Sequence, residues 1–110
     1  MRTQHSLKLE ILSGPLDGAI VVLTHESAWG SAGTGPLVFP WDAELGHPQA
    51  WFLPTDDTWV LVGVTSQHGT YRINTEEPVN DGQQIKLAPG DILKASGTWL
   101  AVVEISGGAS

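Results

Sequence analysis

Apolar and polar residues alternate with a period of two along much of this chain, beginning with Leu7-Lys8-Leu9-Glu10-Ile11. The most apolar run, Trp59-Val60-Leu61-Val62-Gly63-Val64, is short and rich in β-branched residues. No window carries the spacing of an amphipathic helix, in which every third or fourth residue is apolar. The pattern therefore predicts short strands, at residues 7–12, 19–24, 27–31, 37–39, 50–53, 59–64, 71–74, 84–87, 91–95 and 98–105.

Glycine and proline separate the predicted strands at short intervals. Gly14-Pro15-Leu16-Asp17-Gly18 is typical of a hairpin connection, because proline fixes φ and glycine is free to take positive φ. Ala88-Pro89-Gly90-Asp91 predicts a tight turn, and Ser96-Gly97 predicts the last corner. About ten short strands joined by such turns predict an all-β sandwich or barrel.

The length of 110 residues fits one domain, which we place at residues 1–105, followed by a Gly/Ser-rich tail or linker at residues 106–110. The absence of cysteine excludes disulfides, Cys-ligated zinc and a thiol nucleophile. No apolar run approaches the roughly 18 residues that span a bilayer, and the first residues have no apolar signal core. We expect a cytoplasmic domain that does not insert directly into a membrane.

Charge argues against nucleic acid as a partner. The net charge is −7, with five Lys and Arg against twelve Asp and Glu. No Lys or Arg occurs between Lys8 and Arg72. Since phosphate neutralisation supplies most non-specific affinity for nucleic acids, the composition predicts that the chain does not bind nucleic acid.

The five tryptophans divide into two groups by their sequence context. Trp51, Trp59 and Trp99 lie in strand patterns, which predicts packing in the core or on a sheet face. Trp29 and Trp41 lie at junctions of strands and loops, which predicts positions on the rim of the fold.

Several segments, taken in chain order, resemble a forkhead-associated (FHA) domain over nearly the whole sequence. The resemblance rests on the hairpin at 14–18, on Trp29-Gly30-Ser31, on Leu37-Val38-Phe39-Pro40, on Gly46-His47-Pro48-Gln49-Ala50, on Ser66-Gln67-His68-Gly69-Thr70-Tyr71 and on Leu87-Ala88-Pro89-Gly90-Asp91-Ile92-Leu93. It implies an FHA-like sandwich of about eleven mostly antiparallel strands. It also implies that loops at one end of the sandwich bind phosphothreonine peptides through an arginine and further donors.

The sequence departs from the family pattern at the positions that the resemblance assigns to the partner. Ser31 stands where the family has its phosphate-binding arginine, and Gly46 stands where it has the phosphate-binding serine. His47 occupies the neighbouring basic position, and His68 replaces the asparagine that grips the peptide backbone. Ser66 keeps the family residue. These five positions are the candidate partner-binding residues, and their composition predicts that phosphothreonine recognition has been lost.

Four further loop positions are expected to mark the architecture and not the ligand. Gly30 and Gln49 lie at the family's Gly-Arg and structural-histidine positions, and Gly69-Thr70 matches the family's Gly-Thr pair. In this fold class such a pair fixes the backbone geometry of the loop.

The leading hypothesis is a non-enzymatic protein–protein interaction or scaffolding module that needs no cofactor and no metal. Degenerate FHA domains of this kind are similar to the cytoplasmic domains of ring proteins in bacterial secretion machines, which suggests a tether to a larger assembly.

Two alternatives stay open. One is genuine phosphothreonine-peptide binding through His47, His68, Ser66 and backbone amides, with affinity that rises as the histidines are protonated. The other is a small-ligand or metal-binding β domain that uses loop histidines, His25 among them.

Overall fold

In the computed structural model, residues 6–33, 35–46, 48–56, 58–64, 70–72, 77–79 and 82–106 are described. Their strands and one short 3-10 helix are β1 (Ser6–Ile11), η1 (Gly14–Leu16), β2 (Ile20–Leu23), β3 (Ser27–Trp29), β4 (Ala50–Pro54), β5 (Trp59–Gly63), β6 (Thr70–Arg72), β7 (Glu77–Val79), β8 (Gln84–Lys86), β9 (Ile92–Ala95) and β10 (Thr98–Ser106). Across these residues, no helix has the length and apolar character needed to cross a bilayer.

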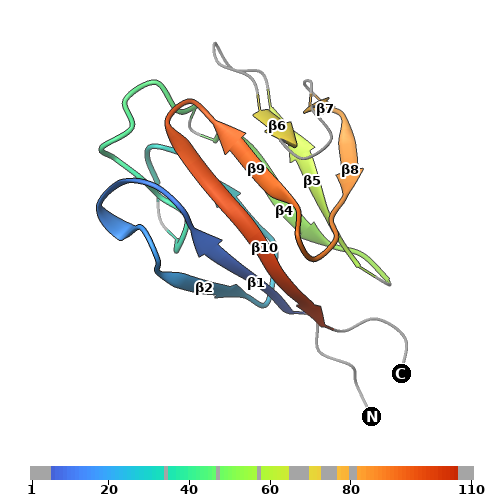
Figure 1. Ribbon diagram of the computed structural model, residues 1–110. Coiled ribbons are helices and arrows are strands. Elements are labelled where there is room, and N and C mark those ends of the chain that lie inside the picture. The colour runs from blue at the N-terminus through green and yellow to red at the C-terminus, as the bar shows by residue number, and fades with distance from the viewer. Residues whose placement is uncertain are drawn as a thin grey trace.

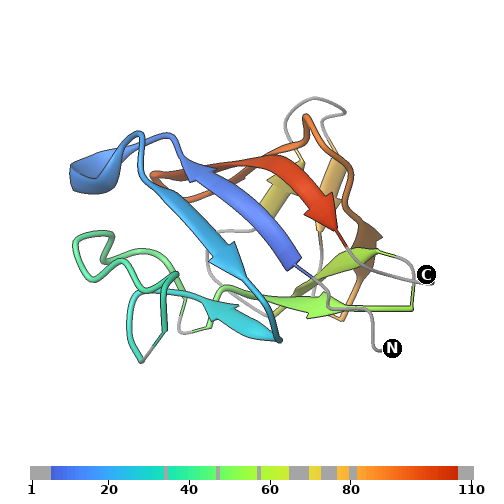
Figure 2. The same ribbon diagram turned by 90° about the horizontal axis from the view of Figure 1, so that it is seen from below.

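The strands form two sheets packed as a sandwich (Figures 1 and 2). The six-stranded sheet has the order β2-β1-β10-β9-β6-β7, and the four-stranded sheet has the order β3-β4-β5-β8. Every neighbouring pair of these strands is antiparallel. The all-β, FHA-like sandwich predicted from the sequence is confirmed.

The structure differs from the predicted strands in three places. Residues 37–39 do not form a strand, since Val38 makes only an isolated parallel bridge to Gly30. Strand β7 was not predicted, because its central residue Pro78 cannot donate to a ladder; β7 lies at the edge of its sheet, where proline is tolerated. Strand β10 extends through Ser106, the first residue of the expected tail, and residues 107–110 lie outside the described part of the chain.

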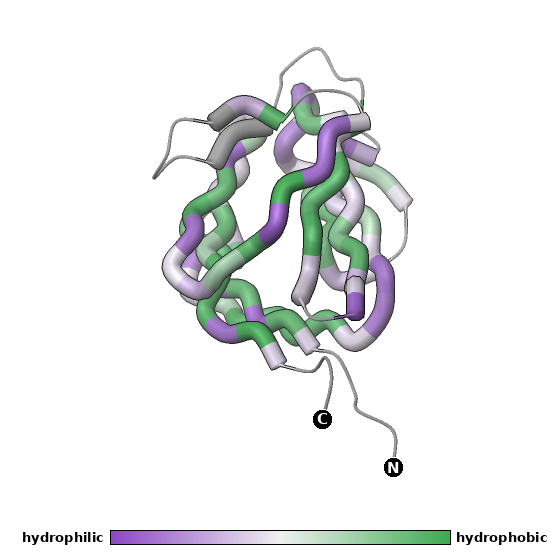
Figure 3. The backbone as a smooth tube through the Cα atoms, turned by 90° about the vertical axis from the view of Figure 1, so that its right-hand side faces the viewer, coloured by the Kyte–Doolittle hydropathy of each residue, from purple (hydrophilic) through white to green (hydrophobic). Residues whose placement is uncertain are grey.

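Buried hydrophobic residues form one cluster that contains side chains from both sheets. Hydrophobic and hydrophilic residues alternate along the backbone of several strands (Figure 3). Along β1 the side chains of Leu7, Leu9 and Ile11 are buried, while Lys8 and Glu10 between them are partly exposed. The four largest fully buried side chains are Trp29, Trp59, Phe39 and Phe52.

Trp29 departs from its predicted position, whereas Trp51 lies on a sheet face, as its strand pattern allows. Trp29 is fully buried and its ring lies 6.1 Å from that of Phe52, so the prediction of a rim position is wrong. It is buried because its side chain lies on the inward face of β3, where its register partner on β4 is the buried Ala50. Trp51 points outward with 37% of its surface exposed, because its neighbours Ala50 and Phe52 take the inward positions of β4.

Candidate partner-binding loop

The long connection between β3 and β4, residues 30–49, carries Gly30, Ser31, Gly46 and Gln49, and we call it the 30–49 loop. Gly30, the first residue of the loop, is hydrogen-bonded to the segment 37–39 through both its amide and its carbonyl. The Gly30 amide donates to the Leu37 carbonyl at 3.0 Å, and the Gly30 carbonyl accepts from the Phe39 amide at 2.8 Å. Leu37 and Phe39 are fully buried, so the loop is anchored in the core.

Ser31 directs both of its hydrogen-bond donors into the loop. Its hydroxyl donates to the Leu45 carbonyl at 2.8 Å, and its backbone amide donates to the Gly46 carbonyl at 2.9 Å. A longer contact of 3.5 Å joins the hydroxyl to the Gly46 carbonyl. Ser31 therefore holds the two sides of the loop together at the position where the resemblance implies a phosphate-binding arginine.

Gln49 holds the other half of the loop. Only 1% of its surface is exposed, and its Oε1 accepts a hydrogen bond from the Gly46 amide at 2.8 Å. The backbone amide of Gln49 donates to the Trp29 carbonyl at 2.7 Å, and the backbone carbonyl of Gln49 accepts from the Val64 amide at 3.3 Å. A buried amide side chain satisfied in this way fixes the backbone around it.

The tight packing beside Gly46 gives a direct prediction. A Cβ at this position would lie 3.0 Å from the Pro48 carbonyl oxygen and 3.2 Å from Gln49 Oε1. Gly46→Ala should therefore lower the free energy of unfolding by about 2 kcal/mol through overpacking. Gly97→Ala is the matched control, since its nearest neighbour would lie 3.7 Å away. Denaturant unfolding of both variants measures the difference, and equal midpoints would contradict the packing.

Asp42 ties the 30–49 loop to the turn between β9 and β10. Its Oδ1 accepts from the Ser96 hydroxyl at 2.8 Å, and its Oδ2 accepts from the Gly97 amide at 3.0 Å and from the Thr98 hydroxyl at 2.8 Å. Partial burial alone would raise the pKa of Asp42, but these bonds and one from the Glu44 backbone outweigh it and hold the pKa below its ordinary value of 3.8. No motif or spacing in the sequence indicated a role for Asp42.

Several predicted site residues cannot be placed. His47, Ser66, His68 and Gly69 lie outside the described residues, and their roles stay predictions. Thr70 begins β6, where its backbone pairs with β7 and β9.

The described residues give little support to the alternative in which loop histidines bind a metal ion or a small ligand. His25 is exposed and its Nδ1 lies 3.2 Å from the Thr24 hydroxyl. It precedes β3, whereas Ser31 and Gly46 follow that strand, so the length of β3 separates His25 from the candidate residues. Within the described part of the chain, no three His, Cys, Asp or Glu side chains are grouped so that they could hold a metal ion.

The described lysines lie on strands of the two sheets and not in the 30–49 loop. The Lys8 ammonium is 4.0 Å from Glu104, and the Lys94 ammonium lies 5.5 Å from the centre of the Trp99 ring. Lys86 is on β8. The loop itself contains Asp42 and Glu44 and no Lys or Arg, so its permanent charge is negative.

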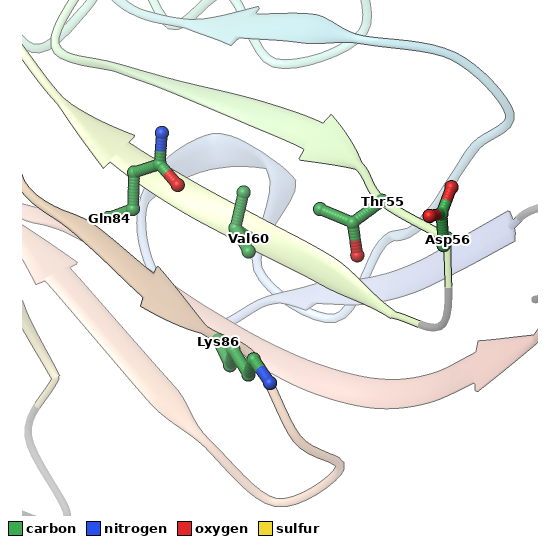
Figure 4. Close-up of a pocket in the computed structure, with 5 residues that line it drawn as sticks. All are labelled: Thr55, Asp56, Val60, Gln84 and Lys86. Atoms are coloured by element: carbon green, nitrogen blue, oxygen red, sulfur yellow. The ribbon is translucent and has the colours of Figure 1, made fainter.

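Two of the hollows on the outside of the molecule are lined by described residues, and neither contains Ser31, Gly46 or Gln49. One, of about 370 Å³, is lined by Thr55, Asp56, Val60, Gln84 and Lys86. Figure 4 shows that these side chains come from β8, from β5 and from the turn that follows β4. The other, of about 240 Å³, is lined by His25, Glu26, Ser27, Ala28, Gly35, Pro36 and Trp51.

No family model matches the chain, and no curated protein matches it. Several solved structures share its fold. An FHA domain of a hypothetical protein from Arabidopsis thaliana has a TM-score of 0.77 at 23% identity, over 97% of this chain and 92% of that chain.

Two further FHA domains are similar. One, from a structural and functional analysis of phosphothreonine-dependent FHA domain interactions, has a TM-score of 0.74 at 20% identity, over 90% of this chain and 96% of that chain. The other is the kinase-interacting domain of the kinase-associated protein phosphatase of Arabidopsis, with a TM-score of 0.72 at 20% identity over the whole of both chains. The chain therefore has the fold of an FHA domain.

Proposed function

We propose that this chain is a non-enzymatic protein-interaction module of the FHA type that binds its partner through the 30–49 loop without requiring phosphothreonine. The shared fold supports the first part of the proposal, since similar domains take part in phosphothreonine-dependent or kinase interactions. Loss of the phosphate requirement rests on the loop itself.

The observation that carries the proposal is the internal use of the loop's donors. A bound phosphate needs several N–H or O–H groups directed at its oxygens. Here the Ser31 hydroxyl and amide and the Gly46 amide are all committed to acceptors within the loop. Freeing them for a ligand would leave the Leu45 carbonyl and the buried Gln49 side chain without these bonds, at a cost of about 1–3 kcal/mol for each buried group.

Charge points in the same direction. A phosphothreonine side chain brings close to two negative charges at pH 7. The 30–49 loop offers carboxylates and no permanent cation, on a chain whose net charge is −7. Such a loop favours a partner surface with basic or neutral groups, and the attraction to a basic surface weakens as salt is added.

The first test compares matched phosphothreonine and threonine peptides by isothermal titration calorimetry. We expect no more than a twofold difference in affinity within any pair. Binding of the phosphorylated peptide at micromolar affinity, lost in its threonine counterpart, would overturn the proposal. Titrations at pH 6 as well as pH 7 test binding by protonated histidines, because affinity that rises with acidity would favour the phosphopeptide alternative.

A second test looks for the partner chemistry that the proposal requires. Binders selected from a displayed library of unphosphorylated peptides should lose at least tenfold in affinity on Ala32→Trp, which adds bulk at an exposed position of the 30–49 loop. Val103→Glu changes an exposed side chain on the six-stranded sheet and should leave affinity unchanged. Selected peptides that are indifferent to Ala32→Trp would exclude the 30–49 loop as the binding surface.

A further inference from the structure

The outward side of the four-stranded sheet, which we call the outer face, carries a compact set of apolar side chains. The strand register aligns them in two rows that cross the sheet. The Trp51 row follows the pairs Ala28–Trp51, Trp51–Val62 and Val62–Gln84. The Leu53 row follows the pairs Leu53–Val60 and Val60–Lys86.

The Leu53 row continues to an acidic residue on the far side of the sheet. Ser27 is the register partner of Phe52, so Glu26, one residue earlier, lies beside Leu53. Glu26 lines the same hollow as Trp51, which places it on the outer face. The row therefore reads Glu26, Leu53, Val60, Lys86, with an exposed carboxylate at one end and an exposed ammonium at the other.

The side chains in the centre of the outer face are not part of the main core. Trp51 exposes 37% of its surface, and Leu53 and Val62 are partly exposed. Val60 exposes only 7%, yet it does not belong to the hydrophobic cluster between the sheets. An apolar sheet face with a hollow on each side has the character of a contact surface.

The arrangement of charge identifies the occupant that fits this face. Consider a two-fold axis that lies in the plane of the outer face and runs along the strands between β4 and β5. It places β3 of one copy over β8 of the other, and β4 over β5. Glu26 of each copy then faces Lys86 of the other, Trp51 faces Val62, and Leu53 faces Val60. A contact in which the same patch serves on both sides is the usual form of a homodimer interface.

We propose that the outer face binds a second copy of this chain, in a two-fold dimer held by the Trp51 and Leu53 rows and by two Glu26–Lys86 pairs between copies. The two sheets pack face to face with their strands nearly aligned, as in other β-sandwich contacts. The Lys86 side chain of each copy reaches into the hollow that holds Glu26 of the other.

The dimer is expected to be weak. The four strands are three, five, five and three residues long and about 4.8 Å apart, so they present roughly 250 Å² of sheet. Stable interfaces bury about 800 Å² on each partner, so a Kd of roughly 0.1 mM is reasonable. Sedimentation equilibrium from about 10 µM to about 1 mM covers this range. Dimer at the upper end supports the proposal, and monomer throughout overturns it.

Charge variants test which surfaces meet. Glu26→Lys and Lys86→Glu shift the net charge in opposite directions, yet each places like charges opposite one another and should weaken association at least tenfold. The double variant E26K/K86E keeps the net charge at −7 and exchanges the two charges, so it should associate like the natural chain. Association of either single variant at natural strength would overturn the proposal.

Mixing the two single variants gives the most specific result. In a mixed dimer the charges at positions 26 and 86 each meet their opposite, so an equimolar mixture should recover dimer that neither variant forms alone. Circular dichroism of each variant establishes that it is folded. Failure of the folded variants to form a mixed dimer would overturn the proposed geometry.

Val22→Glu serves as the matched control on the other sheet. Val22 is 53% exposed on β2, an edge strand whose apolar side chains form the main rival surface. The natural degree of association should survive this substitution. If Val22→Glu abolishes association while the charge variants do not, the contact runs through β2 and the outer face is excluded.

Discussion

Trp29→Ala is expected to lower the free energy of unfolding by about 4 kcal/mol, the largest effect of any substitution considered for this chain. The side chain is fully buried and packs against Phe52, so truncation leaves a large cavity in the core. Trp29 also carries the carbonyl that accepts the Gln49 amide at the base of the 30–49 loop. Denaturant unfolding followed by far-ultraviolet circular dichroism measures the loss.

Trp29→Phe should cost clearly less than Trp29→Ala. The indole Nε1 of Trp29 is buried with no hydrogen-bond partner among the described residues, which costs about 1–3 kcal/mol in the natural chain. Phenylalanine fills most of the space and removes that N–H group. Trp41→Ala is the control, since Trp41 is 44% exposed and its loss should cost about 1 kcal/mol. Equal losses for Trp29→Ala and Trp41→Ala would contradict the described core.

Asp42→Asn is expected to lower the free energy of unfolding by about 2 kcal/mol at neutral pH. The carboxylate accepts three hydrogen bonds from the β9–β10 turn, from Ser96, Gly97 and Thr98. Asparagine has one side-chain oxygen to accept these bonds. Its NH₂ group would replace the other oxygen and would meet hydrogen-bond donors of the turn, with which it cannot pair as a donor. Chemical denaturation at a series of pH values measures both the size of the loss and its dependence on pH.

The pH dependence has a definite sign. Because the pKa of Asp42 is lower in the folded protein than its ordinary value of 3.8, the ionised carboxylate is favoured by folding. Its contribution is complete above the ordinary value and is lost as the pH falls through the folded pKa. The gap between the natural chain and Asp42→Asn should therefore close as the pH falls below 3.8. Asp17→Asn, at an exposed position outside the contact between Asp42 and the β9–β10 turn, is the control variant.

Local sequence signals predicted most of the strands, because a strand with one buried face must alternate. The two clear misses have local causes. Glu77-Pro78-Val79 lacks the composition of a strand but occupies a sheet edge, where the missing amide of proline costs little. Leu37-Val38-Phe39 has the composition of a strand, yet Leu37 and Phe39 are buried as anchors of the 30–49 loop.

The contacts that shape the candidate site were beyond local prediction. Asp42 meets residues 54 to 56 positions away, and nothing in the sequence pairs them. Ser96 adopts a φ of 54°, whereas its neighbour Gly97 does not have positive φ. Because glycine takes positive φ most readily, residue type alone would place the positive φ at Gly97. The outward position of Trp51 could have been found, since Ala50 and Phe52 flank it in a period-two pattern.

Strand β10 runs the length of the sandwich and has a consequence for attachment. Thr98, at its start, is bonded to Asp42 of the 30–49 loop, and Ser106, at its end, pairs with Ser6 of β1. Nine residues of strand cover about 30 Å, so positions 6 and 106 stand side by side roughly that far from the loop. A fluorophore, bead or fused protein joined next to either position would sit at the opposite pole from the 30–49 loop. Such a fusion leaves that loop facing the surroundings, and a short peptide could join positions 106 and 6 into a circularly permuted chain.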